Sequence, residues 1–114
     1  MKQKAIPTLR PVGFRGSWFA TIRGKQLACV HKHWFKRLRY EDPGLSPRDP
    51  GHAYFVGEIE RTRRVILTDD IVTAEGAEIR FTRKGYIALW SVSDINFDQS
   101  GLHFQFVDRL ANLV

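Results

Sequence analysis

Residues 65–107 read VILTDDIVTAEGAEIRFTRKGYIALWSVSDINFDQSGLHFQFV, and this stretch decides the fold class. Its short runs of β-branched and aromatic residues are typical of strands. Groups of turn-forming residues separate the runs at Asp69-Asp70, Glu75-Gly76, Lys84-Gly85 and Gln99-Ser100-Gly101. The pattern predicts a meander of short strands over residues 65–68, 71–73, 78–83, 86–92, 95–97 and 102–107.

Alternation within these strands indicates which side chains face the core, because successive residues of a strand point to opposite faces. The residues expected to point inward are Ile79 with Phe81, Ile87 with Leu89, and the row Leu102, Phe104 and Phe106. The apolar C-terminal residues, Leu110 and Leu113, are expected to dock on the same core as a final turn.

Upstream of this stretch, the chain predicts a β-hairpin and then a loop. Residues 17–22 and 26–33 are rich in aromatic and β-branched residues, and Arg23-Gly24-Lys25 lies between them. Residues 31–40 fit either period, so we expect strand to about His33 and then irregular chain or one helical turn. Residues 42–51 contain three prolines and two glycines, which indicates a surface loop.

A short helix is the favoured interpretation of the residues after this loop. Asp49 and Pro50 fit the N-cap and the first helical position, and Phe55 with Ile59 is an apolar pair at helical spacing. Gly51 and Gly57 each weaken the helix by about 1 kcal/mol relative to alanine. A strand through residues 54–56 is the alternative.

Together these elements predict a mainly β (α+β) protein, either a small antiparallel β-barrel or a strongly bent sheet, with one or two short helices. The 114 residues suit a single compact domain spanning 1–114, with a basic N-terminal segment (1–40) and the Pro/Gly-rich surface loop (42–51). No apolar run is long enough for a signal peptide or a membrane span, so we expect a cytoplasmic protein without a membrane partner. Cys29 is the single cysteine, which fits a reducing compartment.

Charge is distributed unevenly along the chain. Residues 1–40 contain ten Lys or Arg and no acid, whereas residues 41–114 contain eight basic and twelve acidic residues, and the net charge is +6. Six of the fourteen aromatic residues lie in the acid-free segment. A positive potential attracts polyanions, and aromatic rings among cationic side chains can stack on unpaired bases.

We therefore predict a small basic module that binds nucleic acid, RNA or DNA, through phosphate contacts and aromatic stacking. The candidate surface comprises Arg15, Trp18, Arg23, Lys25, Lys32, Trp34, Lys36, Arg37 and Arg39. Trp18 and Trp34 are alternatively core residues. The main alternative function is a non-enzymatic protein-interaction module whose basic face binds an acidic partner, and a solvated basic face without a nucleic-acid partner is a further interpretation.

Enzymatic and metal-binding interpretations are weaker. A metal-independent ribonuclease using His31 and His33 is the third function considered, because histidine can transfer protons while arginine stabilises phosphate charge. Cys29, His31 and His33 would share one strand face, but no zinc-binding spacing accompanies them. Phosphate-loop, dinucleotide and Gly-x-Ser-x-Gly motifs are absent. We expect no cofactor and no bound metal, and assign no catalytic residue.

Overall fold

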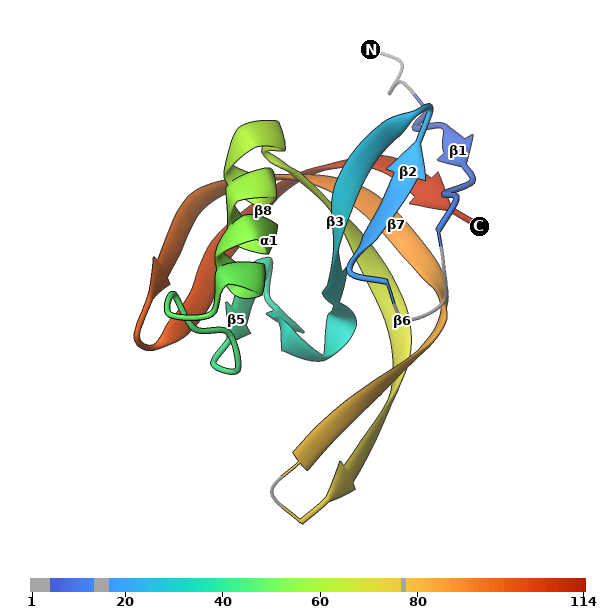
Figure 1. Cartoon of the computed structure of the whole chain (residues 1–114). Coiled ribbons are helices and arrows are strands. Elements are labelled where there is room, and N and C mark those ends of the chain that lie inside the picture. Colours follow the sequence, from blue (N-terminus) through green and yellow to red (C-terminus); the bar gives the residue numbers. More distant parts are fainter. Residues whose placement is uncertain (1–4, 14–16, 77) are drawn as a thin grey trace.

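One bent sheet carries a single helix in a computed structural model that describes residues 5–13, 17–76 and 78–114 (Figure 1). The described ranges contain eight strands, one α-helix and one 3-10 turn. The strands are β1 (Thr8–Leu9), β2 (Phe19–Ile22), β3 (Lys25–His31), β4 (Phe35–Lys36), β5 (Arg39–Asp42), β6 (Arg64–Glu75), β7 (Glu78–Asp98) and β8 (Gly101–Leu113). The 3-10 turn η1 covers Lys32–Trp34, and the helix α1 covers Pro50–Thr62.

The strands follow the order β2-β3-β6-β7-β8-β5-β4, and β1 pairs with β8. Most neighbours are antiparallel, but β3 with β6 and β1 with β8 are parallel. The predicted fold class, a β-rich α+β protein with one helix, is confirmed. Of its two forms the bent sheet is correct, because the sheet does not close into a barrel.

Three long strands replace the six short strands predicted after residue 64. The turns predicted at Asp69-Asp70 and Lys84-Gly85 are wrong, because these residues lie within the β6–β7 ladder, where Asp69 pairs with Gly85 and Asp70 with Arg83. The pairing register of β6 with β7 shifts next to Thr68 and next to Asp69, and the strand continues through both irregularities. The turns predicted at Glu75-Gly76 and Gln99-Ser100-Gly101 are confirmed, since β6, β7 and β8 meet there.

The described part of the chain before α1 consists of short strands and one 3-10 turn with their connections. The hairpin predicted around Arg23-Gly24 is confirmed as β2 and β3. Strand β3 ends at His31 rather than His33, and one 3-10 turn follows. The β4–β5 hairpin over residues 35–42 was not predicted. The following loop leads into α1 at Pro50.

The predicted helix is confirmed, and the alternative strand over residues 54–56 is wrong. Asp49 is the N-cap, and its Oδ1 accepts from the backbone N–H groups of Gly51 and His52 at 2.8 and 3.3 Å. The C-cap Arg63 has a φ of 56°, and its N–H donates to the Ile59 carbonyl. No helix in the described ranges has the length and apolar character needed to cross a membrane.

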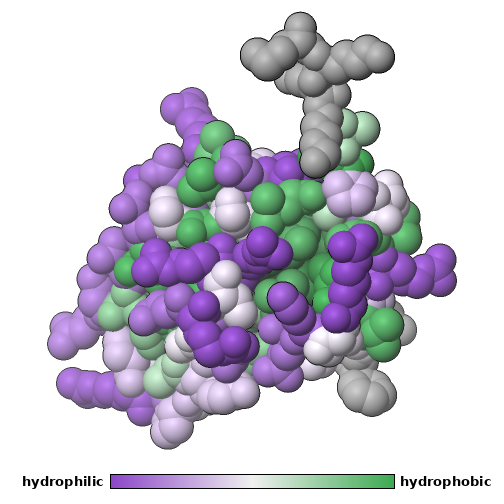
Figure 2. All heavy atoms as spheres, turned by 90° about the horizontal axis from the view of Figure 1, so that it is seen from above, coloured by the Kyte–Doolittle hydropathy of each residue, from purple (hydrophilic) through white to green (hydrophobic). Residues whose placement is uncertain are grey.

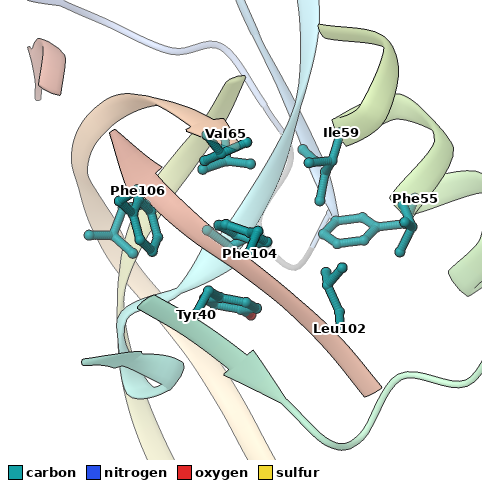
Figure 3. Packing of buried hydrophobic residues seen from close by; sticks show 12 residues of the cluster. Tyr40, Phe55, Ile59, Val65, Leu102, Phe104 and Phe106 are labelled. Carbon is teal, nitrogen blue, oxygen red and sulfur yellow. The ribbon is translucent and has the colours of Figure 1, made fainter. Parts of the chain in front are cut away.

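The main core lies between α1 and the concave face of the sheet (Figure 3). The row Leu102, Phe104 and Phe106 is at most 1% exposed, as the alternation predicts. Phe55 and Ile59 reach this row from the helix. A smaller cluster on the other face includes Leu89 and Leu113, and Leu113 belongs to β8 rather than to a separate final turn.

Beyond this body, β6 and β7 continue as a two-stranded arm (Figure 1). The molecule therefore measures 48 × 28 × 28 Å. The prediction that Ile79 faces the core is wrong, because Ile79 lies on the arm and is 47% exposed. Phe81, expected to be its core-facing companion, is half-buried. The arm extends beyond the part of the sheet that α1 covers, so its side chains do not have the cover that the main core has.

Candidate functional site: an aromatic cavity beside a basic groove

A hydrogen-bonded group joins the end of β3 to the middle of β6. His31 pairs with Thr68 in the parallel β3–β6 register, which brings its ring to Asp70. His31 Nδ1 lies 2.9 Å from Asp70 Oδ2, and the Thr68 hydroxyl donates to the same oxygen at 2.5 Å. The Asp70 side chain is 1% exposed. The Asp70 carboxylate therefore fixes the orientation of the His31 ring through Nδ1. The second ring nitrogen, Nε2, is the one that Asp70 does not bind.

Opposing influences act on the pKa of Asp70. Burial alone would raise it, because a low-dielectric environment disfavours the charged carboxylate. Hydrogen bonds from His31 and Thr68 and the positive charges of His31 and Arg83 outweigh burial, and the pKa is lowered below its usual value. Asp70 is thus an ionised partner for His31 at neutral pH.

His31 and Asp70 line a cavity of about 560 Å³, which we call the aromatic cavity. Aromatic side chains from five different parts of the chain contribute to its wall: Trp18, Trp34, Tyr40, Phe55 and Phe81. Its polar lining includes Asp42, His52 and Arg83. A mostly apolar cavity with a few polar groups is the usual form of a small-molecule or base-binding site.

Trp18 stands in the aromatic cavity wall with 45% of its surface exposed. Its ring stacks against His52, with centroids 5.3 Å apart and planes 21° apart, and Phe55 meets it edge-on at 5.2 Å. Two residues of α1 therefore hold this exposed indole in place. Trp34 is half-buried, and its ring nitrogen is buried without a hydrogen-bond partner in the described ranges.

Two further groups give the cavity its polar character. Asp42 is 7% exposed, and burial raises the pKa of its carboxyl above the usual value, although Oδ1 accepts from the Gly44 N–H at 2.9 Å. Arg83 donates from Nη2 to the Ser17 carbonyl at 2.6 Å. Within the described ranges, Nε and Nη1 of Arg83 are buried and have no partner. The cavity thus combines a cation, an ionised carboxylate and a more easily protonated carboxyl.

Cys29 also lines the aromatic cavity, but as a thiol. It is 5% exposed, and burial raises its pKa to about 11. A thiolate, the nucleophilic and metal-binding form, is therefore disfavoured. Because β3 ends at His31, His33 does not continue the predicted row and is an exposed residue of η1. In the part of the chain that the structure describes, no three His, Cys, Asp or Glu side chains gather as metal ligands.

A second hollow of about 520 Å³ borders the β4–β5 hairpin, and we call it the basic groove. Four of the nine residues predicted to bind nucleic acid line it: Trp34, Lys36, Arg37 and Arg39. His33, His103 and Ser100 lie in the same wall. Glu41 is the acid of this lining, and its Oε1 lies 3.7 Å from Arg39 Nε. Lys36 and Arg37 form no ion pair with any described residue.

The remaining predicted residues are distributed elsewhere. Arg23 and Lys25 lie at the β2–β3 turn, at the opposite end of β3 and about 20 Å from Lys32 at the usual rise of a strand. Figure 2 views the molecule from this end and shows hydrophilic side chains around a hydrophobic area. Lys32 forms an ion pair with Asp69, Trp18 lies in the aromatic cavity, and Arg15 falls outside the described residues.

Sequence reasoning singled out His31 but missed the other polar residues of the aromatic cavity, Asp42, His52, Asp70 and Arg83. His31 and Asp70 are 39 positions apart, and only the parallel β3–β6 pairing brings them together. The one available signal was Asp69-Asp70 inside an otherwise apolar strand pattern. Trp34 and Pro43 line both the aromatic cavity and the basic groove, so the two hollows are neighbours. Comparisons of the chain with protein-family models, curated proteins and solved structures find no match.

Proposed function

We propose that this protein binds single-stranded nucleic acid and holds the phosphates of the strand in the basic groove. The observation that carries the proposal is the gathering of Lys36, Arg37 and Arg39 around one hollow. Lysine and arginine side chains gain affinity for a polyanion by releasing its condensed counterions. Lys36 and Arg37 have no competing carboxylate partner among the described residues, so their charge is available to a phosphate.

The surroundings of the groove favour a single strand over a duplex. Trp34 stands in the same wall as the cations, and half-exposed Trp18 lies in the neighbouring cavity. A single strand can turn its bases toward such rings, whereas the bases of a duplex are already stacked and paired. The cations at the β2–β3 turn are about 20 Å from the groove side of β3, so they do not extend it into a longer track.

The chain offers a matched pair of variants to test this proposal. Lys36→Gln/Arg37→Asn removes two charges at the groove, and Arg23→Asn/Lys25→Gln removes the same two residue types at the other turn. Arg37 and Arg23 have φ values of 51° and 52°, and asparagine tolerates this left-handed conformation. Both variants have the same net charge, so only the position of the lost charge differs.

Fluorescence anisotropy with labelled 12-nucleotide RNA, single-stranded DNA and duplex DNA provides the measurement, at low and moderate salt. We expect the groove variant to bind single strands about tenfold more weakly than the wild-type protein, and the turn variant to lose less than about threefold. Equal losses in both variants would contradict the groove assignment. No binding by the wild-type protein at low salt would overturn the proposal and leave an acidic protein as the partner class for the groove.

The His31–Asp70 pair favours a second candidate function, the metal-independent cleavage of RNA. In its neutral form, with the Nδ1–H held by Asp70, the His31 ring can accept at Nε2 a proton from a ribose 2′-hydroxyl, whose oxygen then attacks phosphorus. His33 is a candidate for protonating the departing 5′-oxygen. Both rings contact Phe81, with centroid distances of 4.0 Å for His31 and 5.7 Å for His33.

Incubation of the wild-type protein with labelled single-stranded RNA in the presence of a chelator tests this second candidate. Cleavage is expected to produce 2′,3′-cyclic phosphate ends and to be lost in His31→Ala, with folding checked by circular dichroism. Equal cleavage by His31→Ala and the wild-type protein would identify a contaminating nuclease. Intact RNA in every sample would remove this candidate and leave the binding proposal unaffected.

A further inference from the structure

We propose that the aromatic cavity receives one unstacked nucleobase of the strand whose phosphate lies in the basic groove. This inference rests on the proposed function and adds to it the part of the ligand that the cavity recognises. Its ligand class is a nucleobase attached to a sugar-phosphate backbone.

Continuity between the two hollows is the first argument. Trp34 and Pro43 line both, so a ligand with one anionic part and one flat apolar part can occupy them together. A nucleotide has these two parts, joined by a sugar. The residue types around the hollows follow this division, because the cations Lys36, Arg37 and Arg39 lie around the groove and aromatic rings line the cavity. The surface that the groove itself exposes is mostly apolar, so the charged ends of the three cations act at its rim. The volume of about 560 Å³ lies within the usual range of small-ligand sites.

Trp18 provides the stacking surface. An indole with 45% of its surface exposed is ordinarily free to change rotamer, but stacking on His52 and the edge contact with Phe55 hold this one. His52 is itself positioned, since its Nδ1 accepts from the Ser46 N–H at 3.0 Å. An aromatic platform that is fixed before binding loses little conformational entropy when a base stacks on it. Such stacking tolerates every base, because each has a π-face.

Unpaired polar groups supply the second interaction that a base requires. The Trp34 indole N–H and two nitrogens of Arg83 are buried and have no acceptor in the described ranges. Both residues line the aromatic cavity. A buried donor without an acceptor is unfavourable, and the edge of a base presents carbonyl and ring-nitrogen acceptors. Because these nitrogens have almost no solvent-accessible surface, a base reaches them only after a small movement of the side chains that cover them. The buried carboxyl of Asp42 lies in the same lining and can accept from an exocyclic amino group.

The β6–β7 arm extends the apolar wall outward. Val72 pairs with Phe81 and Ala74 pairs with Ile79, so these four side chains share one face of the arm. Ile79 and Phe81 line the aromatic cavity, while Val72 and Ile79 are 38% and 47% exposed. This face places apolar surface next to the cavity opening, where it can cover the sugar of the inserted nucleotide or the neighbouring base.

A double-mutant cycle between strand and protein tests the inference. The strands are 12-nucleotide oligonucleotides, each either intact or carrying a single abasic position that is moved along the strand. The proteins are wild type, Trp18→Leu and Trp18→Phe. Tyr54→Leu is the matched control, because Tyr54 is an aromatic residue that is 58% exposed and lies outside both hollows.

We expect one abasic position to weaken wild-type binding about tenfold, the usual effect of losing one base–aromatic stack. Trp18→Leu should bind the intact strand about tenfold more weakly and should no longer distinguish it from the abasic strand. Trp18→Phe should restore part of the affinity, whereas Tyr54→Leu should behave as the wild-type protein. A 2-aminopurine at the sensitive position should be quenched by the wild-type protein and less so by Trp18→Leu.

The possible failures are distinguishable. If the wild-type protein binds strands and loses affinity in Lys36→Gln/Arg37→Asn, but no abasic position and no change at Trp18 alters its affinity, the base site is overturned and the groove stands. If the wild-type protein binds no strand, the proposed function falls first and the base site falls with it. Circular dichroism of Trp18→Leu shows whether unfolding causes its loss of strand affinity. The conservative variant Trp18→Phe keeps an aromatic ring and gives a second measurement of the same effect.

Discussion

Asp70 and Asp42 are both buried carboxyls, yet their surroundings shift their pKa values in opposite directions. For Asp70, two hydrogen bonds and nearby positive charge outweigh burial and lower the pKa. For Asp42, burial dominates and raises the pKa. Relative to the unfolded chain, folding therefore stabilises the ionised form of Asp70 and the protonated form of Asp42.

The two carboxyls should have opposite effects on stability as the pH changes. Asp70 contributes stability that is present above its unfolded pKa, about 3.9, and is lost as the pH falls through its lower folded pKa. We expect Asp70→Asn to lower the free energy of unfolding by about 1–3 kcal/mol at pH 7, with the difference shrinking between pH 5 and pH 2. Asp42 contributes stability at low pH that is lost as the pH rises through its raised folded pKa, so Asp42→Asn should be more favourable at pH 7 than at pH 3.

Urea denaturation of the three proteins at pH 7, 5 and 3, followed by circular dichroism, gives the free energies. Differences that do not change with pH for both variants would contradict the assigned pKa directions. Neither carboxyl was predictable as a site residue, because Asp70 acquires its role from His31, 39 positions earlier. Trp18 was predictable as a candidate, since an aromatic residue among cations is visible in the sequence, but its support by His52 and Phe55 required the fold.

At the scale of elements, the two short hairpins show that a tight turn is recognisable in the sequence only when it contains typical turn residues. Each has a two-residue turn in the left-handed region, Arg23-Gly24 in the first and Arg37-Leu38 in the second. The first was predictable because glycine favours positive φ. The second turn contains no glycine, and the residue types of Arg37 and Leu38 are not typical of a turn. The long strands were mispredicted for a related reason, since Asp69-Asp70 and Lys84-Gly85 are typical of turns but lie within a ladder.

Leu38 should therefore limit the stability of the second hairpin. Its φ of 64° is unfavourable for a leucine, and its side chain is 45% exposed. Its carbonyl accepts from Phe106 N–H at 2.7 Å, a bond that does not depend on the side chain. We expect Leu38→Gly to raise the free energy of unfolding by about 0.5–1 kcal/mol. Gly24→Ala, at a φ of 77°, should lower it by a similar amount.

Urea denaturation at pH 7 measures both changes. A loss of stability in Leu38→Gly would mean that the leucine side chain stabilises the hairpin by more than its backbone conformation costs. Because the β4–β5 turn carries Arg37, the same variant also shows whether a relaxed turn alters strand binding. An unchanged affinity is expected, since the substitution leaves all the cations of the basic groove in place.

At the scale of the whole molecule, the charge segregation of the sequence is only partly preserved in space. Asp69 pairs with Lys32, and Glu41 lies beside Arg39, so acids of the later chain neutralise part of the basic segment. Arg23 and Lys25 lie at the other end of β3. Folding therefore divides the predicted surface and leaves three of its cations, Lys36, Arg37 and Arg39, in one groove.

The salt dependence of binding distinguishes the groove from the whole predicted surface. For single strands, the logarithm of the association constant falls by about 0.7 per phosphate contact for each unit of log salt. Contacts from the three groove cations predict a slope of about −2, whereas the seven Lys and Arg residues of the sequence-predicted surface would give about −5. Titrations between 50 and 200 mM salt separate these values. A slope near −5, reduced equally by Lys36→Gln/Arg37→Asn and Arg23→Asn/Lys25→Gln, would show that a strand contacts both ends of β3, which a ligand confined to the groove does not reach.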